Sequence, residues 1–202
     1  MSPEFLLTTF IVCITPGIGV VYTLSMTLGG GLRSGMWATV GCTIATVLHL
    51  GVAMAGLAAI LHTSAVLFQV IKFAGVACLL WMAWAVLQST GALAIEAADG
   101  GSAQRIVWRG IVMNLLNPKL PLFFVAFLPQ FMPAGDATAL GPMLALGAAF
   151  SVMTFGTFVL YAVIAVSGRR AILSSPSVLI WMKRAFAVSF AALGARLAFE
   201  RA

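Results

Sequence analysis

The sequence is poor in charged residues, and this excludes most soluble functions. Only 8% of its 202 residues are Asp, Glu, Lys or Arg, whereas 62% are hydrophobic. The mean hydropathy of +1.10 is higher than a soluble domain of this size carries. The composition therefore predicts a membrane protein.

Acidic residues and cysteines are scarce as well. No set of His, Cys, Asp and Glu has metal-ligand spacing, no nucleophile has a partner base, and no phosphate-binding glycine loop is present. We therefore expect neither an enzyme nor a bound cofactor or metal. The three cysteines, Cys13, Cys42 and Cys78, fall inside apolar stretches, where we expect them to pack as small hydrophobes.

Long apolar stretches are what the chain has in abundance. A helix needs about 20 apolar residues to cross the ~30 Å hydrocarbon core of a bilayer. Six stretches qualify, at residues 5–28, 36–61, 64–88, 110–132, 141–167 and 177–199. We predict an all-α polytopic membrane protein that forms a single domain over residues 1–202. Its parts are half one at 1–88, a polar cytoplasmic loop at 89–108 and half two at 109–202.

Basic residues indicate the sidedness of the helices. Lys and Arg occur in or around the first, third and fifth connections, as Arg33, Arg105, Arg109, Arg169, Arg170, Lys183 and Arg184. Because basic loops stay in the cytoplasm, both termini are expected outside, and the second half is then inverted relative to the first. We read the basic excess as a topology signal, with the lipid bilayer as partner and no nucleic acid.

Two of the apolar stretches are interrupted by proline near the middle, at Pro16 and Pro118. Proline frees backbone carbonyls, and inside a bilayer such breaks persist only where protein or a cavity covers them. One break alone is adequately explained as a packing kink. Two breaks at matching places in two halves indicate a transporter with an inverted 3+3 repeat and broken first and fourth helices.

A lysine and two amides lie beside the second break. If the fourth helix starts near Gly110, Lys119 lies roughly 14 Å deep, close to the midplane. An ammonium there costs about 2.5 to 3.5 kcal/mol and usually faces a cavity or partner, the alternative being a side chain that snorkels to the interface. We expect seven residues to bind or gate a small-molecule substrate: Thr15, Pro16, Gly17, Asn114, Asn117, Pro118 and Lys119.

His49 is the candidate for proton coupling. At 100° per residue it shares one helix face with the small residues Ala38, Gly41, Ala45 and Gly56. Small residues mark close helix packing, so His49 is expected to face protein and not lipid. Its imidazole can exchange protons near neutral pH, although a histidine hydrogen-bonded within the core is the alternative.

The motifs around the breaks resemble a known family. The runs at 117–124 (NPKLPLFF) and 127–131 (FLPQF) resemble the fourth-helix signature of the LysE/RhtB amino-acid exporters. The Thr-Pro-Gly run at 15–17 and the Gly41, His49 and Gly56 pattern are similar to that family too, and the resemblance covers essentially the full chain. It implies export of amino acids or their derivatives from the bacterial cytoplasm across the inner membrane, in exchange for protons.

The sequence also departs from the family pattern. Ile18 stands where the family often has proline, and Cys78 and Ala83 replace a common tyrosine and glycine, so substrate specificity does not transfer. Two alternatives stay open: an exporter of inorganic cations, although the apolar stretches lack carboxylates, and a thiol-disulfide electron conduit, which would need a facing cysteine pair. The oligomeric state, including a homo-oligomer, is also left open.

Overall fold

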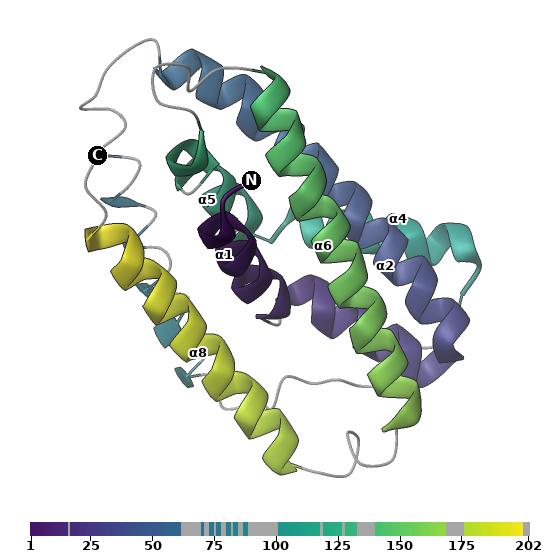
Figure 1. Cartoon of the computed structure of the whole chain (residues 1–202). Coiled ribbons are helices and arrows are strands. Elements are labelled where there is room, and N and C mark those ends of the chain that lie inside the picture. The colour runs from purple at the N-terminus through teal and green to yellow at the C-terminus, as the bar shows by residue number, and fades with distance from the viewer. Residues whose placement is uncertain are drawn as a thin grey trace.

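The computed structural model shows a bundle of helices (Figure 1). It describes residues 1–15, 17–61, 70, 73–74, 76–77, 80–81, 83–84, 87–88, 101–117, 119–126, 128–132, 140–168 and 176–199. The third predicted helix, 64–88, is described only at isolated residues, and Pro16, Pro118 and most of the polar loop lie outside the described residues.

Every element in the described part of the chain is helical, which confirms the predicted all-α class. The elements are α1 (Pro3–Ile14), α2 (Ile18–Leu61), α4 (Ala103–Leu115), α5 (Lys119–Ala126), the 3₁₀ turn η1 (Leu128–Phe131), α6 (Leu140–Ser167) and α8 (Pro176–Phe199). By length and composition, two stretches are suited to crossing a bilayer: Ile18–Ala55, with a mean hydropathy of 1.7, and Leu140–Ser167, with 2.0.

The outer surface of the bundle is apolar. Val52 and Val152 are each 72% exposed, and large aliphatic or aromatic side chains are exposed on each long helix: Leu7, Phe10, Val47, Leu48, Trp108, Leu144, Leu160 and Trp181. Water would drive such a surface to aggregate, whereas lipid tails solvate it. The exterior therefore agrees with a membrane protein.

α2 contains a sharp reversal at Gly31. The residue has φ 75° and ψ −176°, a backbone conformation that side-chain-bearing residues rarely adopt. The two parts of α2 then run back along each other, with Thr27 beside Gly35 and the Cys42 thiol 3.8 Å from the Gly19 carbonyl oxygen. The predicted connection between 28 and 36 is therefore too long, because helix continues up to the turn on both sides.

α4 begins at Ala103, earlier than the predicted fourth helix at 110–132. The hydroxyl of Ser102 accepts a hydrogen bond from the backbone N–H of Arg105 at 3.4 Å, which caps α4 and makes residues 103–108 helical. These residues were expected in the polar loop, because Arg105 and its neighbours are hydrophilic. In the structure Arg105 is exposed on the outer side of α4, while Ile106 is buried against α2.

The packing of α4 against α2 depends on small residues. The space where a Cβ of Gly41 would lie is filled by the backbone of Val107, and a Cβ on Gly110 would lie 3.2 Å from the carbonyl oxygen of Ala38. The Tyr22 hydroxyl donates to the carbonyl oxygen of Ile106 at 2.8 Å. This contact holds the start of α4 against α2.

α5 packs into an apolar cluster that it shares with α1 and α6. The Phe123 ring stacks on Phe150 of α6 at a centroid distance of 4.8 Å, and Phe124 meets the same ring edge-on at 4.9 Å. Phe5 of α1 packs edge-on against Phe131 at 5.3 Å. α1, α5 and α6 therefore share one core, which places the start of α5 near the end of α1.

Candidate functional site

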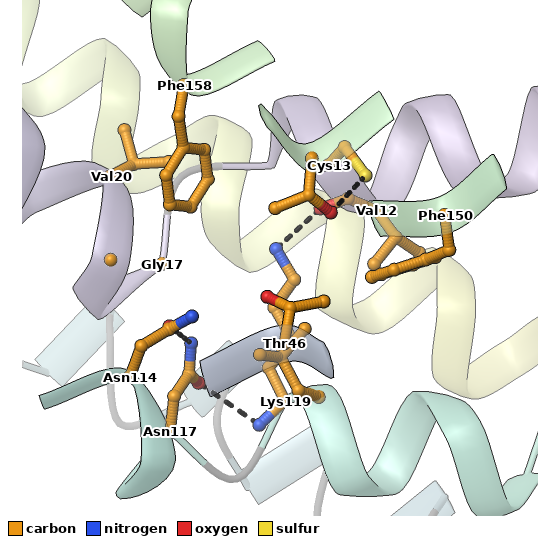
Figure 2. A pocket seen from close by; sticks show the side chains of 13 residues that line it. Val12, Cys13, Gly17, Val20, Thr46, Asn114, Asn117, Lys119, Phe150 and Phe158 are labelled. Atoms are coloured by element: carbon orange, nitrogen blue, oxygen red, sulfur yellow. Dashed lines mark hydrogen bonds between the residues drawn. The ribbon is translucent and has the colours of Figure 1, made fainter. Parts of the chain in front are cut away.

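Both predicted helix breaks are present, and they touch. α1 ends at Ile14 and α2 starts at Ile18, while α4 ends at Leu115 and α5 starts at Lys119. Gly17 in the first break lies against the second break, where a Cβ on it would be 3.2 Å from Asn117 Nδ2 and 3.9 Å from Lys119 Nζ. Figure 2 shows this junction, with the lysine side chain running toward α1.

Lys119 is buried, with only 7% of its surface exposed. Its Nζ donates hydrogen bonds to the backbone carbonyl oxygens of Val12 at 2.5 Å and Thr15 at 2.7 Å. The last carbonyls of a helix have no partner within it and carry the negative end of the helix dipole. The cation therefore caps the broken end of α1. The amine lies inside the protein against α1 and not at its surface, which argues against the snorkelling alternative.

The position of Lys119 in its own helix is otherwise unfavourable. It is the first residue of α5, where the helix dipole repels a positive charge. The carbonyl oxygens of α1 supply the opposite partial charge across the junction. The positive charge of Lys119 is therefore unfavourable within α5 alone and is stabilised by the carbonyl oxygens at the end of α1.

The two asparagines form a chain of hydrogen bonds. Asn114 Nδ2 donates to the carbonyl oxygen of Cys42 in α2 at 2.8 Å, and Asn117 Nδ2 donates to Asn114 Oδ1 at 3.2 Å. Asn117 Oδ1 in turn accepts from the backbone N–H of Lys119 at 3.1 Å. The amides thus link α2, the end of α4 and the start of α5, and Asn117 satisfies the backbone N–H of Lys119, which has no partner within α5.

His49 lies next to the site but does not line it. Its Nε2 is 3.2 Å from the backbone carbonyl oxygen of Asn114, and since a carbonyl only accepts, this nitrogen carries the proton of that bond. Ala38 and Ala45 on the same face are fully buried. His49 faces protein as predicted.

Two polar residues of the junction, Thr154 and Tyr161, were missed in the sequence. The Tyr161 hydroxyl donates to the carbonyl oxygen of Ile14 at 2.6 Å, and the Cys13 thiol lies 3.3 Å from the Thr154 hydroxyl. Thr154, Thr157 and Tyr161 are spaced three and four residues apart, which puts them on one face of α6. Polar residues at that spacing in an apolar helix were a usable signal.

A small enclosed cavity lies between the two breaks. Its volume is about 20 Å³, which is room for about one water molecule and too little for an amino acid. It is lined by Val12, Cys13, Gly17, Gly19, Val20, Thr46, Asn114, Asn117, Lys119, Leu120, Phe150, Thr154 and Phe158. The site is therefore closed to an amino acid in this structure, with amides and a cation on the α4 and α5 side and aromatic rings on the α6 side (Figure 2).

An apolar exterior, two broken helices and a buried cation between them define a helical membrane protein of the kind that carries solutes. Comparison with known proteins agrees with this class. Residues 10–201 match the LysE type translocator family, and the chain belongs to that family, as its motifs predicted.

Named relatives extend over most of the chain. A leucine efflux protein of Enterobacter sp. (strain 638) is 29% identical over 150 residues, which cover 72% of this chain and 70% of that protein. A homoserine/homoserine lactone efflux protein of Salmonella typhimurium is 29% identical over 199 residues, covering 98% of this chain and 95% of that protein. No solved structure matches the chain.

Proposed function

We propose that the protein is a secondary transporter that exports amino acids or their derivatives from the cytoplasm across the bacterial inner membrane. The observation that carries the proposal is the junction of two broken helices at the buried Lys119. Family membership and relatives named for efflux of leucine and of homoserine or its lactone support it.

The chemistry of the junction suits a zwitterion. The carbonyl oxygens of Val12 and Thr15 accept from a cation, which matches an α-ammonium group. The amine of Lys119 and the amide of Asn117 are donors, which match a carboxylate. Phe150 and Phe158 offer an apolar wall to a side chain. The proposed binding and gating residues are Thr15, Pro16, Gly17, Asn114, Asn117, Pro118 and Lys119.

The architecture that we propose is six transmembrane helices in an inverted 3+3 repeat. The breaks at corresponding places in α1–α2 and α4–α5 support it, because such repeats place the substrate between matching broken helices. Both termini would lie outside. Cysteine-accessibility labelling at an exposed position near each end, for example a cysteine in place of Glu4 or Phe199, tests this sidedness, and labelling from the cytoplasmic side alone would contradict it.

Proton exchange is the proposed energy source, with His49 as the candidate carrier. Its hydrogen bond to the backbone of Asn114 supports a link between imidazole and site. If export is coupled to protons, we expect a protonophore to stop efflux. We also expect efflux by the His49→Gln variant to be independent of the proton gradient. Efflux that continues unchanged with the gradient collapsed would contradict proton coupling while leaving export intact.

An efflux screen tests the export function. Cells that express the protein are loaded with dipeptides, and the free amino acids released into the medium are compared with those from cells carrying an empty vector. We expect faster release of one or a few amino acids, and loss of that release in Lys119→Met. Arg105→Met is the matched control, since it removes one exposed cation far from the cavity. No released amino acid, with Lys119→Met equal to wild type, would refute the proposal.

A further inference from the structure

We propose that Lys119 occupies, in this closed conformation, the position that the substrate's own ammonium group takes during transport. On binding, the substrate ammonium replaces Lys119 Nζ on the carbonyl oxygens of Val12 and Thr15. The displaced lysine then pairs with the substrate carboxylate. This inference rests on the proposed function and names the subsite for each charged group of the substrate.

Two carbonyl oxygens at the end of α1 have fixed hydrogen-bond partners, and two others accept from a side chain that can move away. The carbonyl of Ile11 accepts from both the N–H and the hydroxyl of Thr15, at 3.0 and 2.6 Å, and that of Ile14 accepts from the Tyr161 hydroxyl. These partners belong to short or rigid side chains, or to the backbone. The carbonyls of Val12 and Thr15 accept instead from one long flexible side chain. They form a site for a single ammonium group.

The space around the lysine leads to the same conclusion. A cavity of about 20 Å³ cannot hold a substrate while Lys119 stays in place. Among the described residues that line the cavity, Lys119 is the one with a charge, and its side chain is an aliphatic primary amine. When it moves, it vacates a volume shaped for an aliphatic chain ending in an ammonium, bounded by Leu120, Phe150 and Phe158.

Charge balance favours the exchange. Removing Lys119 from its carbonyls without replacement would leave two buried acceptors and a buried cation without partners, which is strongly destabilising. A zwitterion resolves both at once, because its ammonium satisfies the carbonyls and its carboxylate satisfies the lysine. A ligand with only one of these groups leaves one requirement unmet. The junction therefore opens for free amino acids and excludes N-acylated ones.

Chemical rescue tests whether the carbonyl site accepts a free amine. In purified Lys119→Ala, propylamine has the atoms that the substitution removes beyond Cβ. We expect propylamine to raise the thermal stability of Lys119→Ala in a saturable way, with an affinity about tenfold or more above that for wild type, since a hydrogen bond to a charged group is worth about 1.5 to 3 kcal/mol. Propanol, which lacks the charge, is the control. Equal propylamine affinity in variant and wild type would overturn the inference.

A second measurement uses the unmodified chain, so that a poorly folded variant does not decide the matter. The sequence has three lysines, Lys72, Lys119 and Lys183, and a ¹³Cε lysine label gives three NMR signals, assigned with Lys72→Arg and Lys183→Arg. The exported amino acid should shift the Lys119 signal, and its N-acetyl derivative should not. An unchanged signal at saturating amino acid would overturn the inference while export, measured by efflux, stands.

Discussion

The contact of Gly41 with α4 allows a quantitative test of the structure. A Cβ added at Gly41 would overlap the carbonyl oxygen of Val107 and lie 3.0 Å from two further backbone atoms of that residue. Backbone atoms cannot rotate away as a side chain can. To restore an ordinary C···O contact of roughly 3.3 Å, α4 has to retreat by about 1 Å, so Gly41→Ala is expected to separate the two helices.

The expected loss of stability follows from two opposing terms. Overpacking costs about 1–3 kcal/mol, whereas alanine gains roughly 0.5–1 kcal/mol over glycine within a helix. The net loss is about 1 kcal/mol at the middle of these ranges and about 2.5 kcal/mol at most. At about 2–4 °C per kcal/mol for a chain of this size, the melting temperature should fall by about 2–4 °C, and by about 10 °C at most.

The same shift should reach the site. Retreat of α4 by about 1 Å would lengthen the 2.8 Å hydrogen bond from Asn114 Nδ2 to the Cys42 carbonyl oxygen beyond the usual limit of about 3.2 Å. The amide chain would lose its anchor on α2. We therefore expect Gly41→Ala to reduce efflux as well as stability.

Thermal unfolding in detergent, followed by tryptophan fluorescence, measures the stability change. Gly51→Ala is the matched control, because Gly51 lies on the same helix with no described atom within 4 Å of its added Cβ. It should raise the melting temperature by about 1–4 °C, from its gain of roughly 0.5–1 kcal/mol. If both variants melt at the same temperature, the close packing of α2 on α4 is wrong.

Three further variants test individual contacts. Asn114→Ala removes the acceptor of the buried Asn117 Nδ2 and one donor to the Cys42 carbonyl, which still accepts from Thr46 Oγ1, so we expect a loss of about 1–3 kcal/mol in thermal stability and little efflux; full efflux would contradict the site. Tyr161→Phe removes only the hydroxyl bonded to the Ile14 carbonyl and should cost about 1 kcal/mol in the same melting assay, whereas an unchanged melting temperature would argue against the contact. Cys13→Ala should retain efflux, and its abolition, together with thiol trapping in the wild type, would favour the electron-conduit alternative.

Local chemistry made part of this protein predictable. The scarcity of charge and the long apolar stretches indicate a helical membrane protein. A proline in the interior of a helix removes a backbone hydrogen bond, so both interruptions could be placed from the sequence. The face that His49 shares with Ala38 and Gly41 follows from helix periodicity alone. The family motif at 117–131 identified the class.

Helix boundaries were less predictable, because caps and turns outweigh hydropathy there. Ser102 starts α4 within a hydrophilic stretch that hydropathy assigns to a loop. At Gly31 the chain reverses within one residue, where hydropathy predicts a connection of several residues. Both effects depend on one residue's backbone conformation and leave little trace in the average composition of a window.

The contacts of the site were decided by the tertiary structure. The sequence indicated that Lys119 is a buried cation in need of a partner, and that partner lies 107 residues away at Val12. Pro16 indicates that the carbonyl four residues before it, at Val12, lacks a helical partner, but no pattern could reveal that Lys119 is the group that reaches it. By itself the sequence determined the membrane class and the two breaks, because these depend on composition and on proline. Only the packing of α1 and α6 against α5 decided that the breaks touch and close around one ammonium.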